Sequence, residues 1–407
     1  MNRLATTPGE KMVRNARDLF TPTVPSKRLD PQFRAVAEGA SHEAARTLLN
    51  AIFENFRDVD GNFVKEFQSS GFSARVFELA LFAYIEERNL QLDRTEPAPD
   101  FVVRGDNPVA IEVTTTNPAQ GTPIDLLPSN WLLPHDLDSA DQEFVFQLGK
   151  ALRRKLIHRD AKGHAYWEKP HVEGVPFVIA VGAFHGTHAQ FHVEGLLAKY
   201  LYGIDQEFSH DGAGDLTITQ HDVVEHHWKT KSIPSALFKL PEAADLSGVL
   251  FSNSHTMSKF NRIGIEQGLG NTETALARLG TCYDYTPNST TPSQFAYVVG
   301  DRPEDDLEDF SEGLHLFINP WARVPLNPVS LPGVTSHNLR ESNGLLEATF
   351  PTGFRPFLSK TFVFNGANAK LFARYCQQDF LGLLKPGSPS FGELMGNMSR
   401  EKTEGGS

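Results

Sequence analysis

Two acidic residues lie in neighbouring segments that otherwise have the composition of buried β-strands. Asp100 precedes the apolar run 101–104, and Glu112 lies in the centre of residues 109–115, where its neighbours are apolar or β-branched. A carboxylate inside a core strand is costly unless it is paired or binds a cation. The two segments, joined by the turn GDNP, therefore predict either a structural ion pair or half of a metal site.

A third carboxylate lies on a segment with the pattern of a helix, residues 72–89. Between residues 76 and 85 every residue except Glu78 is apolar or aromatic. Its helical neighbours Ala74, Leu81, Phe82 and Ile85 are apolar as well, so Glu78 faces an apolar stripe. It is either a further group of a metal site or a buried glutamate bonded to a backbone group or to an arginine such as Arg75.

Converging carboxylates of this kind suit a hard divalent cation. Mg²⁺ or Mn²⁺ prefers oxygen ligands, and two or three carboxylates supply them while water fills the remaining positions. Such an ion can activate a water molecule and stabilise negative charge on a phosphate. The residues expected to bind the metal are Asp100 and Glu112, with Glu78 supporting it directly or through water.

The elements that position these groups follow a simple order along the chain. A helix is expected over residues 72–89, strands near 91–95, 101–104 and 109–115, a helix over 142–158 and a buried strand over 176–183. The order is therefore α-β-β-β-α-β. The domains expected are an N-terminal helical region (1–60), a core (61–240), a C-terminal extension that enlarges or covers the sheet (241–400, with strands near 247 and 314) and a disordered tail (401–407).

Composition limits the class of protein. The 407 residues are 40% hydrophobic and 22% charged, and no apolar run is long enough to span a bilayer. The first twenty residues lack the apolar segment of a secretory signal, so a cytoplasmic location without membrane association is expected. Only Cys282 and Cys376 are present, which excludes a disulfide framework and a thiolate zinc site.

The distribution of charge matters more than its sum. The net charge of -12 argues against a uniformly basic nucleic-acid binder. Residues 153–162 (RRKLIHRDAK) nevertheless hold five Lys or Arg residues against one Asp. The acidic residues gather elsewhere, notably in 304–312 (EDDLEDFSE), which is expected to be a solvated loop or helix face.

At this point the residues resemble a known family. A helix with an inward Glu78, then Pro-Asp at Asp100, then Glu112 inside a strand, followed by a helix and a strand, resembles the PD-(D/E)XK nuclease superfamily with its restriction-endonuclease-like fold. The resemblance covers residues 72–183. It implies an α/β core with a mixed sheet and a metal-dependent nuclease, with Glu78, Asp100 and Glu112 at the positions of the superfamily's helix glutamate and two strand acids.

One residue departs from the superfamily pattern. Where the motif has lysine two residues after the strand acid, this chain has Thr114, which lacks both the charge and the reach of an ammonium group. In the helix 142–158, Lys155 lies in the middle of the apolar stripe, whereas Lys150, Arg153 and Arg154 lie outside it. Lys155 is either a relocated catalytic lysine, for which the superfamily offers precedent, or a structural lysine that extends past the helix end.

The sequence thus predicts a magnesium- or manganese-dependent nuclease that hydrolyses phosphodiester bonds. Lys155 is expected to assist the nucleophile or the transition state, and Thr114 to orient water. The partner is nucleic acid, with DNA expected, and the candidate contacts to its phosphates are Lys150, Arg153, Arg154 and Arg159. The alternative is a catalytically inactive nuclease-fold protein that binds nucleic acid or a protein partner.

Two further groups of residues suggest other sites. His185, His188 and His192, with His226 and His227, have spacings that could bind zinc, although no Cys or Glu completes a recognised pattern. A segment after the strand expected near 247, SNSHTMSKFNRIG, places Lys259 and Arg262 in an expected loop, where they could contact a phosphate.

Overall fold

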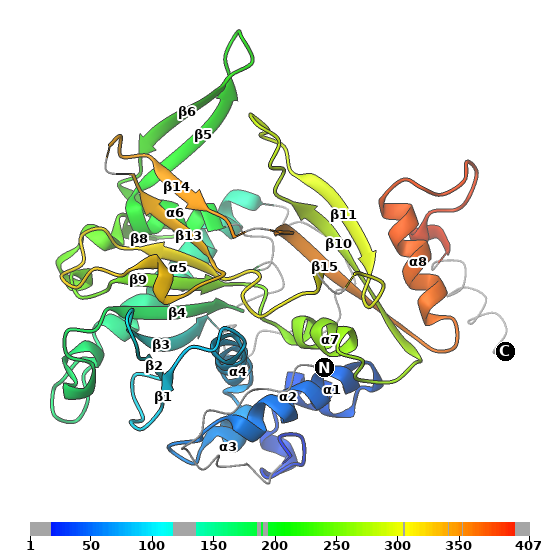
Figure 1. Ribbon diagram of the computed structural model, residues 1–407, viewed down its shortest axis with the longest axis horizontal. Coiled ribbons are helices and arrows are strands. Elements are labelled where there is room, and N and C mark those ends of the chain that lie inside the picture. Colours follow the sequence, from blue (N-terminus) through cyan, green and yellow to red (C-terminus); the bar gives the residue numbers. More distant parts are fainter. Residues whose placement is uncertain are drawn as a thin grey trace.

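The centre of the structure, a computed structural model, is an eight-stranded mixed β-sheet (Figure 1). The structure describes residues 18–116, 136–184, 189, 194–303, 306–340, 342–351 and 353–394. In spatial order the strands are β1 (Leu92–Asp93), β2 (Phe101–Val103), β3 (Val109–Thr116), β4 (Phe177–Ala183), β9 (Gly248–Ser252), β12 (His315–Ile318), β13 (Thr335–Leu339) and β14 (Leu346–Thr349). The predicted α/β class with a mixed sheet is confirmed at this level.

Three neighbouring strands at the centre of the sheet run parallel. β3 pairs in parallel with β4, placing Glu112 opposite Ile179, and β4 pairs in parallel with β9. All residues of these three strands are buried, as expected for strands covered on both faces. Because β3, β4 and β9 point the same way, their carboxyl ends lie at one edge of the sheet.

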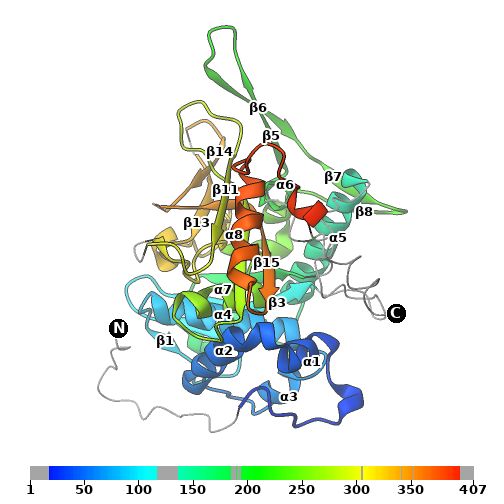
Figure 2. The same cartoon turned by 90° about the vertical axis from the view of Figure 1, so that its right-hand side faces the viewer.

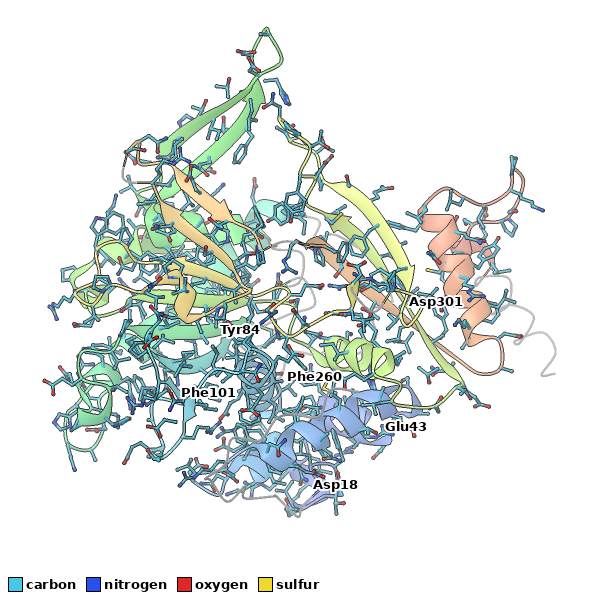
Figure 3. The ribbon with its side chains drawn as sticks, viewed as in Figure 1. Asp18, Glu43, Tyr84, Phe101, Phe260 and Asp301 are labelled. Atoms are coloured by element: carbon cyan, nitrogen blue, oxygen red, sulfur yellow. The ribbon has the colours of Figure 1, made fainter. Side chains whose placement is uncertain are left out.

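Helices from the N-terminal part of the chain cover one face of this sheet. They are α1 (Pro31–Glu38), α2 (Glu43–Asn55), α3 (Phe63–Phe67) and α4 (Phe72–Glu87). Every residue of α4 from Val76 to Ile85 is buried, because this helix is apolar around almost its whole circumference. Tyr84, Phe101 and Phe260, labelled in Figure 3, belong to the hydrophobic core that joins these helices to the sheet.

The opposite face of the sheet carries α5 (Leu137–Leu156) and α6 (Glu194–Tyr202). Side chains of a strand alternate between the two faces. In β4, Val178 and Ala180 accordingly join the core under α4, whereas Ile179 and Val181 join the core under α5 and α6. The sheet is therefore sandwiched between two helical layers (Figure 1).

A second, three-stranded sheet stands beside the first. It has the order β11-β10-β15, with β10 (Thr274–Cys282), β11 (Ser293–Val298) and β15 (Pro356–Asn365). The helix α8 (Ala369–Phe380) covers one face of it with a separate small core (Figure 1). Between the two sheets lies α7 (Met257–Glu266).

Two hairpins complete the described elements. One consists of β7 (Glu225–Trp228) and β8 (Lys231–Pro234). The other, β5 (Ile204–His210) with β6 (Leu216–Asp222), projects away from the body of the molecule in both orthogonal views (Figures 1 and 2). No helix among the described residues is long and apolar enough to cross a membrane.

The element order predicted for the core is the observed order, α4-β1-β2-β3-α5-β4. Two expectations about the C-terminal part were wrong. Lys259 and Arg262 lie on the helix α7 and not in a loop, because tertiary packing buries every residue of this helix from 259 to 264. In the acidic stretch, Glu308 and Glu312 are buried and not solvated, because they pair with cations from α7 and β10. The predicted disordered tail lies outside the described residues.

Candidate active site

The strand β3 presents Glu112 and Thr114 to the face of the sheet covered by α5. Residues two apart on a strand share a face. Ala110 packs in the core under α5, and Glu112 and Thr114 each bond to a side chain of that helix. Both side chains are buried, although they are polar. The local sequence thus directs a carboxylate and a hydroxyl into the layer between sheet and helix.

The ammonium group of Lys155 meets Glu112 in this layer. Lys155 Nζ lies 2.6 Å from Glu112 Oε1, and the two side chains are only 19% and 6% exposed. The second oxygen, Glu112 Oε2, is buried and accepts no hydrogen bond from the described residues. Lys155 therefore points toward the sheet, in agreement with its position on the apolar stripe, and pairs with one of the two carboxylate oxygens.

Arg154 contacts Thr114, the residue that stands where the superfamily motif has lysine. Its Nη2 donates a hydrogen bond to Thr114 Oγ1 over 2.9 Å. The sequence prediction placed Arg154 outside the inward stripe, as a contact to nucleic acid. Its side chain is long enough to turn back to β3 from the last turn of α5, so two consecutive cations of this helix, Arg154 and Lys155, approach the same strand.

Asp100 lies between the two strand positions and the helix α4. Its Oδ2 accepts a hydrogen bond from the backbone N–H of Val113 over 2.7 Å, which fixes the carboxylate beside β3. Burial, and then the negative charge of Glu112, raise the pKa of Asp100 to about 7, although Lys155 and the Val113 N–H oppose the shift. Asp100 therefore exchanges its proton near neutral pH, and its charge is coupled to that of Glu112.

Glu78 is held by two arginines. Arg75, one turn earlier on α4, pairs with Oε2, and Arg94 Nη2 lies 3.3 Å from Oε1. This pairing is the arginine-bonded arrangement that the sequence left open for Glu78. Burial first, then the charge of Asp100, raise the pKa of Glu78, and both arginines oppose this. Both carboxylate oxygens are occupied, so Glu78 is placed to act on the site through Arg94 or water.

Sequence reasoning missed Arg94 and Tyr166. The guanidinium of Arg94 lies 3.9 Å from the Phe56 ring centre, and its Nε and Nη1 are buried without a hydrogen-bond partner among the described residues. The ring of Tyr166, in the 3-10 turn Tyr166–Glu168, lies 5.6 Å from Lys155 Nζ. Burial, then the charge of Glu112 and hydrogen bonding to its carboxylate, raise the pKa of Tyr166, which keeps its phenol protonated at neutral pH. Both residues lie in irregular segments without periodicity, so no pattern marks them.

The remaining predicted phosphate contacts differ in their surroundings. Lys150 is exposed on α5. Arg153 Nη2 lies 3.1 Å from Glu242 Oε1, and this ion pair makes Arg153 less available to bind a phosphate. Arg159 is exposed, donates to the carbonyls of Leu156 and His158, and lies over Trp167. Lys150 and Arg159 are thus the predicted contacts best placed to meet a ligand from solvent.

The donor set fits a magnesium-type ion with few protein ligands. Among the described residues, no group of three or more His, Cys, Asp or Glu side chains is placed to hold a metal. Mg²⁺ usually keeps several waters and binds through one or two carboxylates. Asp100 and Glu112 supply two such carboxylates, and Glu112 Oε2 is a buried oxygen without a donor. The chemistry of these residues therefore suits Mg²⁺ or Mn²⁺.

The histidine-based zinc hypothesis gains no support from the described residues. His226 is buried with Nε2 3.1 Å from Ser235 Oγ, and burial lowers its pKa to about 4. His227 pairs with Glu225. His185, His188 and His192 lie outside the described residues.

Comparisons with family models, with curated proteins and with solved structures found no match for this chain. The resemblance to the nuclease superfamily therefore depends on the ordered motif residues and on the geometry described above.

Proposed function

We propose that this chain is a metal-dependent nuclease that hydrolyses phosphodiester bonds of nucleic acid, built on a restriction-endonuclease-like core. The observation that carries the proposal is the contact between Lys155 and Glu112, 2.6 Å between Nζ and Oε1. It brings an ammonium group from α5 to the strand acid, at a site where the motif lysine is replaced by Thr114. The charge required beside the reacting phosphate is then supplied by a helix and not by the strand.

Asp100 and Glu112 would hold Mg²⁺ or Mn²⁺. When bound, such an ion lowers the pKa of a water molecule and offsets negative charge on the phosphate. Lys155 holds Glu112 Oε1, so the ion would bind at Oε2, and the Val113 N–H would orient Asp100 as the second ligand. Asp100 has to lose its proton before it can bind a cation, which its pKa of about 7 permits at neutral pH.

Neighbouring donors would serve the phosphate. Lys155 and Arg154 would offset the charge that develops on the phosphate oxygens, and Thr114 would orient water beside them. Glu78 would support the site by holding Arg94 next to Asp100. On the surface, Lys150 and Arg159 would contact phosphates of the strand, for which we expect DNA.

A cleavage assay tests the proposal. End-labelled DNA and RNA, single- and double-stranded, are incubated with the protein in Mg²⁺, in Mn²⁺ and in EDTA. We expect metal-dependent cleavage by the parent and a loss of several orders of magnitude in Glu112→Gln, whereas Glu173→Gln, at an exposed glutamate, retains the parental rate. If the parent binds metal and nucleic acid but cleaves no substrate, the chain is the inactive nuclease-fold binder that the sequence also permits.

A further inference from the structure

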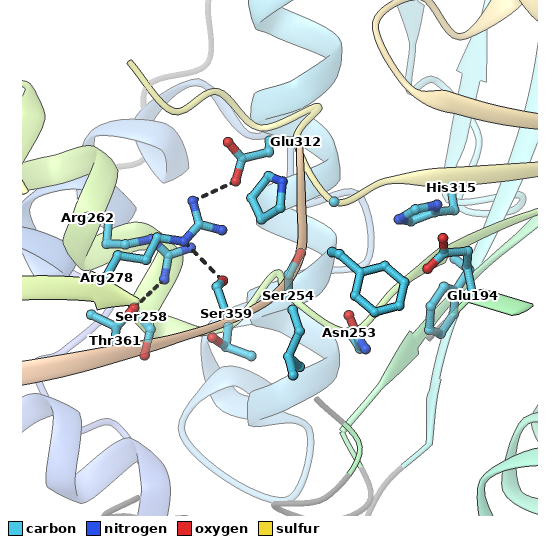
Figure 4. Close-up of a pocket in the computed structure, with 16 residues that line it drawn as sticks. Glu194, Asn253, Ser254, Ser258, Arg262, Arg278, Glu312, His315, Ser359 and Thr361 are labelled. Carbon is cyan, nitrogen blue, oxygen red and sulfur yellow. Dashed lines mark hydrogen bonds and ion pairs between the residues drawn. The ribbon is translucent and has the colours of Figure 1, made fainter. Parts of the chain in front are cut away.

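A polar pocket lies between the two sheets (Figure 4), and neither Asp100 nor Glu112 lines it. It is about 60 Å³ in volume, which is room for about four water molecules. It opens where β9 ends and α7 begins, at the edge of the sheet toward which the carboxyl ends of β3, β4 and β9 point. In open α/β sheets, ligands bind outside the carboxyl ends of parallel strands.

One wall of the pocket carries two arginines together with the carboxylate of Glu312. Arg278 of β10 and Arg262 of α7 line it, although they are only 2% and 4% exposed. Arg278 directs Nε to Ser359 and Nη1 to Glu312 and Tyr297, whereas its Nη2 makes no hydrogen bond to the described residues. A buried guanidinium with a free amino group on a cavity wall is suited to bind an oxyanion.

The scaffold holds this wall rigidly. Arg278 and Thr361 are directly opposite each other on β10 and β15, so their side chains share the face of the second sheet that looks toward the pocket. Arg262 donates to Thr361 Oγ1 over 2.7 Å and to both oxygens of the buried Glu308. Lys259 Nζ lies 2.9 Å from Glu308 Oε1 behind them. The arginines are thus oriented before any ligand enters.

The first turn of α7 adds further donors. Thr256 and Ser258 line the pocket, and Thr256, at the N-cap of this ten-residue helix, makes no side-chain capping bond. The free N–H groups and the dipole of a helix N-terminus favour an anion. Gly313, with φ of +79°, lets the backbone approach Ser254 closely. A side chain at this position would not fit, because its Cβ would lie 2.1 Å from Ser254 Oγ.

The opposite wall has a different character. Glu194 and His315 lie across the pocket from the arginines (Figure 4). Burial lowers the pKa of His315, so its imidazole is neutral at neutral pH. A carboxylate and a neutral imidazole favour hydroxyl or amino groups over a second anionic group. The aromatic rings of Phe251 and Phe357 complete the lining.

We infer that this pocket binds a phosphate monoester, with the phosphate on Arg278, Arg262 and the first turn of α7 and with hydrogen-bond donors of the esterified part toward Glu194. Because both arginines are buried, we expect the ligand to present its phosphate at an end and not within a continuous backbone. A mononucleotide and the phosphorylated terminus of a nucleic-acid strand both have this chemistry. Neither Asp100 nor Glu112 lines the pocket, so binding there is independent of the proposed cleavage.

The test measures binding in EDTA by calorimetry and by melting temperature. The probes are inorganic phosphate, a nucleoside 5′-monophosphate, its nucleoside, and one oligonucleotide with and without a 5′-phosphate. The variant Ser258→Asp places a carboxylate at the pocket in the first turn of α7, where it favours the helix and can pair with Arg262 four residues later. Ser139→Asp makes the same change in the first turn of α5, outside the pocket.

We expect saturable binding of the monophosphate, weakened at least tenfold in Ser258→Asp and unchanged in Ser139→Asp and in Glu112→Gln. Equal affinity for the mononucleotide and the phosphorylated oligonucleotide would show that the pocket recognises only the phosphate monoester. A higher affinity for the phosphorylated oligonucleotide would show that its ligand is the end of a nucleic-acid strand. The inference is overturned if the parent binds no phosphorylated probe, if Ser258→Asp binds as tightly as the parent, or if removal of the phosphate leaves affinity unchanged. Loss of cleavage with retained phosphate binding would count against the proposed nuclease only.

Discussion

Lys155 Nζ and Glu112 Oε1 lie 2.6 Å apart across the interface of α5 and β3, although 43 residues separate them in the sequence. The pair joins the last turn of a helix to the centre of a buried strand. Each group compensates the burial of the other, and the charge of Glu112 in turn acts on Asp100. The stability of this layer and the chemistry proposed for it therefore depend on the same contact.

The first prediction concerns the energy of this pair. Lys155→Met leaves a buried carboxylate without its cation, so we expect a loss of roughly 2–4 kcal/mol in the free energy of unfolding. Adding Glu112→Gln should recover part of that loss, with a coupling energy of at least about 1 kcal/mol in a double-mutant cycle. Lys150→Met, on the exposed side of the same helix, should change stability by less than about 0.5 kcal/mol. Additive effects of the two substitutions in denaturant titrations would show that the contact does not contribute.

The second prediction follows from the raised pKa of Asp100. In the unfolded chain this carboxyl ionises near 4, whereas in the folded protein it keeps its proton up to a pH of about 7. The folded state therefore binds more protons between these values, and its stability falls as pH rises from 4 to 7. Asp100→Asn removes this contribution, so its stability relative to the parent should increase by roughly 2–4 kcal/mol from pH 4.5 to pH 8. A pH-independent difference between the two melting curves would contradict the assigned environment of Asp100.

The third prediction concerns metal binding. Mg²⁺ or Mn²⁺ should raise the melting temperature of the parent by linkage, and should do so less in Asp100→Asn and in Glu112→Gln. Because Asp100 must be ionised to bind a cation, the apparent affinity should increase with pH through about 7, and calorimetry in buffers of different ionisation enthalpy should detect proton release. An equal shift of the melting temperature in parent and Glu112→Gln would exclude this carboxylate as a ligand.

The fourth prediction concerns the surface that meets nucleic acid. Lys150, Arg154 and Arg159 are exposed, and Arg154 is engaged with Thr114, so Lys150 and Arg159 should contribute most to phosphate contacts. Affinity should fall steeply with salt, and the double charge reversal Lys150→Glu with Arg159→Glu should reduce the slope of log K against log salt by about 2. The same slope in parent and variant would show that nucleic acid binds at another surface. An interaction insensitive to salt would indicate a protein partner.

Periodicity made part of this structure predictable. The uninterrupted apolar pattern around Glu78 and the β-branched run around Glu112 correspond to α4 and β3, because both segments are buried along their length. The inward position of Lys155 followed from its helical phase. These features depend on the local pattern of apolar and polar residues, which can be read from one sequence.

Features that depend on distant contacts were missed. The strand β10 pairs with β15, bringing Ala277 opposite Phe362, and such pairing across a long stretch of sequence leaves no local signal. The same contacts bury Arg278 and Glu312, whose charge alone suggests a surface. Arg94 and Arg154 reach their carboxylate and hydroxyl partners through long side chains whose direction is set by tertiary packing. Sequence thus indicated the acidic residues of the site better than the cations around them.

The most direct test of the account is the cleavage rate of Lys155→Met, measured with metal affinity and melting temperature on the same samples. Assays run well below the melting temperature of the variant, with Lys65→Met, at an exposed lysine of α3, as the matched control. We predict that Lys155→Met stays folded and binds Mg²⁺ but loses at least about two orders of magnitude in the rate of phosphodiester cleavage, whereas Lys65→Met retains the parental rate. Cleavage by Lys155→Met at the parental rate would remove Lys155 from the mechanism and contradict the central claim that a helix lysine replaces the missing strand lysine.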